Sequence, residues 1–146
     1  MLDLHSLSTI IERQFEKEFQ ASFDHIEAIL GQNKDKGIRF QKDFSYDDSV
    51  SFHLEMILFE TGYVEMDVYF PFLVDRIENG SLINAFNKKD RVFSLSVMKD
   101  SSLLLRRAFY TEDVFEFTME LKGTFEAFKA EFDDVMDFLH SIHHHG

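Results

Sequence analysis

Two neighbouring segments alternate apolar and polar residues, and this alternation constrains the fold more than any other feature. In residues 50–58 every even-numbered position is apolar, and the same holds for residues 64–70. Side chains of a β-strand point alternately to the two faces of a sheet, so each segment is predicted to be a strand with one apolar face. The stretch Thr61-Gly62-Tyr63 between them predicts an antiparallel hairpin.

The register of this hairpin is predicted by keeping its apolar faces together. A two-residue Thr-Gly loop would set Met66 opposite Ile57, and acidic residues would then fall on the apolar face. A three-residue loop avoids this conflict. It predicts the pairs Leu58 with Met66, Met56 with Val68, and Leu54 with Phe70.

Amphipathic helices are predicted on both sides of the strands. Apolar residues recur at steps of three and four over residues 7–30, which predicts a helix capped by Ser6 or Ser8. The same spacing predicts a closing helix over residues 125–142, capped by Thr124.

Shorter patterns complete the order of elements. Strands are predicted over residues 38–44, 92–98 and 103–110, and a short helix is predicted from Ser81. Residues 112–121 stay open, because their apolar positions alternate as in a strand while the acidic start is typical of a helix. We therefore predict a single α+β domain over residues 1–146. Its antiparallel sheet has five or six strands, the N- and C-terminal helices pack on one face, and the order is α-βββ-α-ββ-α.

The charge balance excludes several classes of partner. The chain has 27 acidic and 15 basic residues, a net charge of −12, which repels phosphate backbones and anionic lipids. Neither a signal peptide nor a membrane span is readable, and there is no cysteine. We expect a cytoplasmic protein with no nucleic-acid or membrane partner.

Catalytic chemistry has little support in the sequence. Glu55, Glu65 and Asp67, with His53, would share one face of the hairpin and could serve as acid and base, but a solvated strand face explains them more simply. Residues 143–145 are histidines at the end of the chain, where a frayed tail explains them as well. We expect no enzyme activity, no metal and no cofactor.

Apolar residues also occur on the face of the hairpin that the core does not need. Ile57, Phe59 and Tyr69 lie there, and Leu104, Ala108 and Tyr110 take the alternate face of a later strand. Such a patch is typical of an interaction surface, and helices packed on a second sheet face would account for it equally well.

Two short stretches suggest a family. Leu82-Ile83-Asn84-Ala85-Phe86-Asn87-Lys88 precedes a predicted strand, and Leu103-Leu104-Leu105-Arg106-Arg107 follows later. With the order of elements, they resemble the bacterial YbjN-like family. Its members are similar in fold to the small acidic chaperones of type III secretion, which bind unfolded segments and often pair as dimers. The resemblance implies a non-enzymatic binding or regulatory role, and it implies a helix over residues 112–121.

These observations predict a protein-binding module, chaperone-like or regulatory, whose partner docks on the second sheet face or on an exposed edge strand. The partner would be another protein, as an unfolded or extended segment, and a homodimer is a further expectation. An acidic immunity-type inhibitor of a basic toxin or nuclease is the alternative. The expected partner-binding residues are Ile57, Phe59, Tyr69, Glu55, Glu65 and Asp67.

Overall fold

A computed structural model describes residues 2–45, 51–71, 74–89 and 91–145. In this part of the chain three helices and six strands follow in the order α-ββββ-α-ββ-α. The elements are α1 (Leu4–Phe19), β1 (His25–Leu30), β2 (Lys36–Ser45), β3 (Ser51–Phe59), β4 (Tyr63–Phe70), α2 (Arg76–Lys88), β5 (Ser94–Val97), β6 (Leu103–Tyr110) and α3 (Val114–His145). The strand before the three predicted ones is an addition to the expected order.

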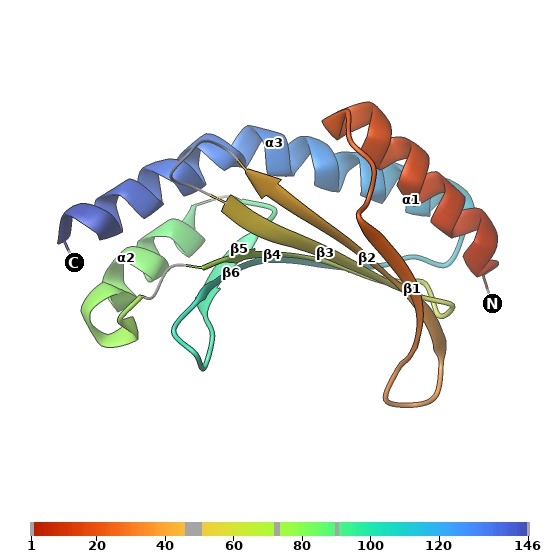
Figure 1. Cartoon of the computed structure of the whole chain (residues 1–146), viewed down its shortest axis with the longest axis horizontal. Helices are drawn as coiled ribbons and strands as arrows, with labels where there is room; N and C mark the ends of the chain where they lie inside the picture. The colour runs from red at the N-terminus through yellow and green to blue at the C-terminus, as the bar shows by residue number, and fades with distance from the viewer. Residues whose placement is uncertain (1, 46–50, 72–73, 90, 146) are drawn as a thin grey trace.

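The six strands form one antiparallel sheet in the order β1-β2-β3-β4-β6-β5, which confirms the α+β class. Helices α1 and α3 lie together on one side of this sheet, as predicted, and α2 packs at the β5 end (Figure 1). The core lies between the sheet and the helices, where apolar burial supplies the main driving force for folding. The even-numbered apolar residues of β3 and β4 are buried in it: Phe52, Leu54, Met56, Leu58, Val64, Met66, Val68 and Phe70.

The β3–β4 hairpin has the predicted loop length but a different centre. Three residues, 60–62, separate the strands, and the observed pairs are Leu58 with Val64, Met56 with Met66, and Leu54 with Val68. The predicted pairs were therefore wrong by two positions. A shift by an even number leaves every side chain on its own face, so the predicted apolar and mixed faces are confirmed.

The first predicted helix was wrong beyond Phe19. Gln20 ends α1 in the left-handed conformation, with φ of 54°, and the chain then enters β1 at the sheet edge. The prediction failed over residues 26–30 because Ile26 and Leu30 are four residues apart. This spacing fits one face of a helix as well as one face of a strand. The cap also differs, because the Asp3 carboxylate, rather than Ser6 or Ser8, accepts a hydrogen bond from the backbone N–H of His5 at 3.3 Å.

The closing helix is longer than predicted. It begins at Val114, where the carboxylate of Asp113 accepts the backbone N–H of Glu116 at 2.8 Å, so residues 114–121 are helical. Thr124 is therefore an interior residue, and its hydroxyl donates to the Glu120 carbonyl instead of capping the helix. Helix α2 likewise starts before Ser81, at Arg76.

Candidate protein-binding face

The sheet face opposite α1 and α3 is the candidate site, and we call it the helix-free face. No helix of the described residues crosses it, and the β1–β2 hairpin and the β5–β6 turn both extend to its side of the sheet (Figure 1). All six predicted partner-binding residues lie on this face, because each occupies an odd position of β3 or β4: Glu55, Ile57, Phe59, Glu65, Asp67 and Tyr69. The interpretation that the protein's own helices cover this face was wrong.

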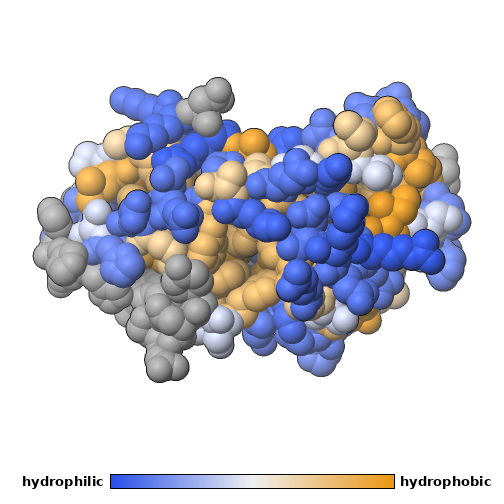
Figure 2. Space-filling view, turned by 90° about the horizontal axis from the view of Figure 1, so that it is seen from above, coloured by the Kyte–Doolittle hydropathy of each residue, from blue (hydrophilic) through white to orange (hydrophobic). Residues whose placement is uncertain are grey.

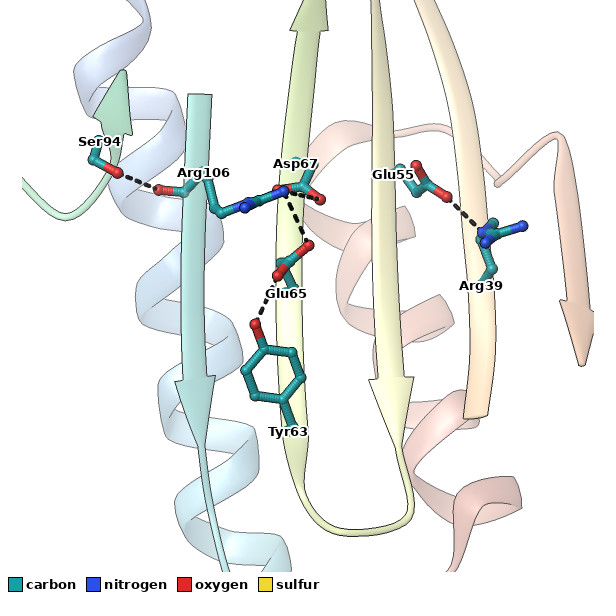
Figure 3. Close-up of polar contacts among 7 residues, drawn as sticks. All are labelled: Arg39, Glu55, Tyr63, Glu65, Asp67, Ser94 and Arg106. Carbon is teal, nitrogen blue, oxygen red and sulfur yellow. Dashed lines mark hydrogen bonds and ion pairs between the residues drawn. The ribbon is translucent and has the colours of Figure 1, made fainter. Parts of the chain in front are cut away.

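One ion cluster on this face is centred on Arg39 of β2. Its Nη1 donates to Oε1 of Glu27 on β1 at 2.9 Å. Its Nε lies 2.6 Å from Oε1 of Glu55 on β3, at an angle that makes this contact an ion pair rather than a hydrogen bond (Figure 3). One arginine therefore links three neighbouring strands through two carboxylates.

A second cluster is centred on Arg106 of β6. Its Nε donates to Oδ1 of Asp67 at 2.6 Å, and its Nη2 lies 3.4 Å from Oε2 of Glu65 (Figure 3). Asp67 and Arg106 are direct cross-strand partners, so the pairing of β4 with β6 sets this contact. The hydroxyl of Tyr63 donates to the other oxygen of Glu65 at 2.6 Å.

The two carboxyl groups of this second cluster differ strongly in pKa. Burial, and then a hydrogen bond with Glu65, raises the pKa of Asp67 to about 7, although Arg106 acts in the opposite direction. Burial also acts to raise the pKa of Glu65, but hydrogen bonds from Asp67 and Tyr63 outweigh it, so this pKa is lowered. The pair therefore holds one proton on Asp67 under mildly acidic conditions, and Glu65 stays ionised.

Apolar side chains lie between and beside the two clusters. Ile57, Phe59 and Tyr69 are each half-buried, so part of each side chain faces solvent. Leu104 is only 2 % exposed and is not accessible to a partner, whereas Tyr110 is 57 % exposed at the end of β6. The face therefore combines accessible aromatic and aliphatic surface with charged groups held in place by their neighbours.

A hollow of about 1140 Å³ opens at one end of this face. The β1–β2 hairpin forms one wall, through residues 29–35, and Ile57, Phe59 and Tyr63 form part of the other. A hollow of this size exceeds the usual range for small-molecule pockets.

Sequence reasoning identified the carboxylates of this face but missed Arg39 and Arg106. Each arginine occupies a strand position whose side chain points to the same face as the carboxylates. The alternation of side chains along a strand was the signal that could have identified them. Their partners become evident only from the pairing of β2 with β3 and of β4 with β6. His53, which was considered with the carboxylates, instead has its Nδ1 within 2.7 Å of Oδ1 of Asp43 on β2.

The opposite side of the molecule also carries hydrophobic areas, interspersed with polar side chains (Figure 2). Three exposed apolar residues lie in the first turns of α3, and Phe115 is 77 % exposed. The three are Val114, Phe115 and Met119. The sequence did not predict them as surface residues. Residues 112–121 could have formed a strand or a helix, and the two would expose different side chains.

The described residues contain no group of three or more histidine and carboxylate side chains placed to hold a metal ion. The side chains of residues 143–145 lie outside this description. Within the described part of the chain, no helix has the length and apolar character needed to cross a membrane.

Comparisons with protein-family models, with curated proteins and with solved structures find no match to this chain. The resemblance to the YbjN-like family therefore stays a prediction, and the arguments for function come from the helix-free face itself.

Proposed function

We propose that this chain is a non-enzymatic protein-binding module, chaperone-like or regulatory, that holds an extended or unfolded segment of another protein on its helix-free face. The observation that carries the proposal is the half-buried apolar group of Ile57, Phe59 and Tyr69 on a sheet face that no described helix covers. Exposed apolar surface of this kind is typical of interaction sites.

The form of the partner follows from the shape of the face. A strand surface flanked by two projecting hairpins suits a segment that lies along it, with apolar side chains reaching the hollow beside Phe59. The resemblance to chaperone-like proteins favours the same kind of partner. The absence of cysteine supports a cytoplasmic location, which we propose as well.

The alternative, an acidic inhibitor of a basic toxin or nuclease, has weaker support. The three carboxylates on which it depends already contact Arg39 or Arg106 of the same chain: Glu55, Glu65 and Asp67. Their charge is therefore partly neutralised before any partner arrives. Binding by this mode would weaken steeply as ionic strength rises, whereas apolar docking would change little.

The test exchanges the apolar residues of the face for serine. The double variant Ile57→Ser and Phe59→Ser should bind a permanently unfolded probe, reduced and carboxymethylated α-lactalbumin, at least about tenfold more weakly, because each side chain contributes buried apolar area. Fluorescence anisotropy of the labelled probe measures the affinity, and circular dichroism checks the fold.

The matched control removes equally apolar residues from the other side of the molecule. Phe115→Ser with Met119→Ser should bind the probe as the wild type does, because both residues lie on α3. Equal affinity of the two double variants, or no binding of the probe by the wild type, would contradict the proposal.

A further inference from the structure

The two edges of the sheet differ in whether their backbone groups are satisfied. At β5 the side chain of Asn87 on α2 closes the edge: its Oδ1 accepts the backbone N–H of Leu95 at 2.8 Å, and its Nδ2 donates to the Leu95 carbonyl at 2.7 Å. The asparagine amide thus takes the place that a neighbouring strand would occupy.

At β1 no such closure exists among the described residues. The backbone N–H of Gly31 donates to Asp35 at 2.8 Å, and the Lys36 carbonyl accepts from Glu60 at 2.9 Å. Odd residues of β1 therefore bond to β2, because bonding direction alternates along an antiparallel strand. It follows that Ile26, Ala28 and Leu30 direct their N–H and C=O groups away from the sheet.

The side chains of this edge are also uncovered. Helix α1 packs mainly against β2 and β3, so the helix side of β1 stays partly exposed. Ile26 is 44 % exposed and Leu30 is 70 % exposed. The strand contains neither lysine nor proline, the residues with which proteins usually prevent pairing at a sheet edge.

We propose that β1 pairs antiparallel with β1 of a second copy of this chain, about a two-fold axis at Ala28. The three outward residues are spaced evenly around Ala28, so this register sets Ile26 opposite Leu30 of the second copy and Ala28 opposite its own counterpart. Each outward residue then exchanges both of its backbone hydrogen bonds. This self-pairing goes beyond the proposed function and does not depend on it.

Other registers are less favourable on physical grounds. A shift by two residues leaves one outward residue of each copy unbonded, and in one direction it sets Glu27 opposite Glu27 of the second copy, where like charges repel. In the proposed register Glu27 lies opposite Ile29 instead. The small side chain of Ala28 permits close approach at the axis.

The dimer should be weak and should respond to salt. A six-residue edge is a small interface, and each copy carries a net charge of −12 that opposes association. Sedimentation velocity should therefore detect a monomer–dimer equilibrium at protein concentrations on the order of 100 µM, which is the weak end of the affinity scale. The dimer fraction should rise with ionic strength, because salt screens the repulsion.

The first test fixes the register by disulfide formation, since the chain has no cysteine of its own. Bonded cross-strand residues have Cα atoms about 5.5 Å apart, which suits a disulfide. Ala28→Cys should therefore oxidise to a covalent dimer on a non-reducing gel. Ile26→Cys should cross-link at least about tenfold more slowly, because its counterpart would be roughly 14 Å away along the strand. Equal rates for the two variants would overturn the register.

The second test removes the interface without cysteine. Ala28→Lys should abolish the dimer, although the added positive charge lowers the overall repulsion, and the monomer should stay folded because the side chain is exposed at an edge. Met119→Lys adds the same charge on α3 and should leave the dimer intact. The proposal is overturned if the wild type is a monomer under all conditions. It is also overturned if Met119→Lys loses the dimer and Ala28→Lys keeps it.

Discussion

Single residues determine the electrostatic character of the helix-free face. Asp67 is buried between Glu65 and Arg106, and its raised pKa of about 7 means that the folded protein holds a proton that the unfolded chain releases at lower pH. A group with a raised folded-state pKa contributes stability below its unfolded pKa and loses it as pH rises. For Asp67, whose ordinary pKa is 3.8, that loss falls between about pH 4 and pH 7.

Asp67→Asn should remove this dependence, because an amide resembles the protonated carboxyl at every pH. The free energy of unfolding of the wild type, minus that of the variant, should fall by at least about 1 kcal/mol from pH 5 to pH 8. Urea denaturation at several pH values measures the difference. Asp133→Asn, an exposed carboxylate on α3, controls for the loss of one negative charge. If this difference in unfolding free energy instead rises with pH, the ion pair with Arg106 has a larger effect on the pKa of Asp67 than burial has.

The elements show which parts of the fold were predictable from sequence. Strands β3 and β4 follow from their period of two, which also predicted that all six candidate residues share one face of the sheet. The boundary between α1 and β1 could not be predicted from sequence, because residues 26–30 fit the repeat of a helix as well as that of a strand. Only their pairing with β2 decides between the two. The arginine partners escaped prediction for the same reason, since cross-strand contacts depend on pairing that is remote in sequence.

Two glycines should respond in opposite ways to substitution by alanine. Gly62 closes the β3–β4 hairpin with φ of 97°, and an added Cβ would strike the backbone carbonyl of Thr111. Gly62→Ala should therefore lower the free energy of unfolding by about 2 kcal/mol or more.

Gly123 is the matched position inside α3, where a Cβ meets open space. Gly123→Ala should raise the free energy of unfolding by roughly 0.5–1 kcal/mol, because alanine loses less conformational freedom in a helix. Chemical denaturation of both variants provides the measurement. Stabilisation by Gly62→Ala would refute the described hairpin geometry.

At the scale of the whole molecule, the sheet is protected on one face and one edge and accessible on the other two. Helices α1 and α3 cover one face, and the amide of Asn87 satisfies the β5 edge. The remaining face and edge are the surfaces that we propose for a partner segment and for a second copy.

Asn87→Ala should release the β5 edge. The backbone groups of Leu95 would lose both hydrogen bonds, and the variant should form assemblies larger than a dimer, which light scattering detects. Asn84→Ala, an exposed substitution on the same helix, is the control and should scatter as the wild type does. Unchanged scattering by Asn87→Ala would show that the edge is closed by other means.

The closed β5 edge has a consequence for how far association can proceed. A sheet that recruits copies through both edges elongates without limit and produces filaments, whereas a sheet with one competent edge stops after a single addition. If β1 pairs as proposed, the side-chain amide of Asn87, which bonds to Leu95 as a neighbouring strand would, limits the assembly to two copies.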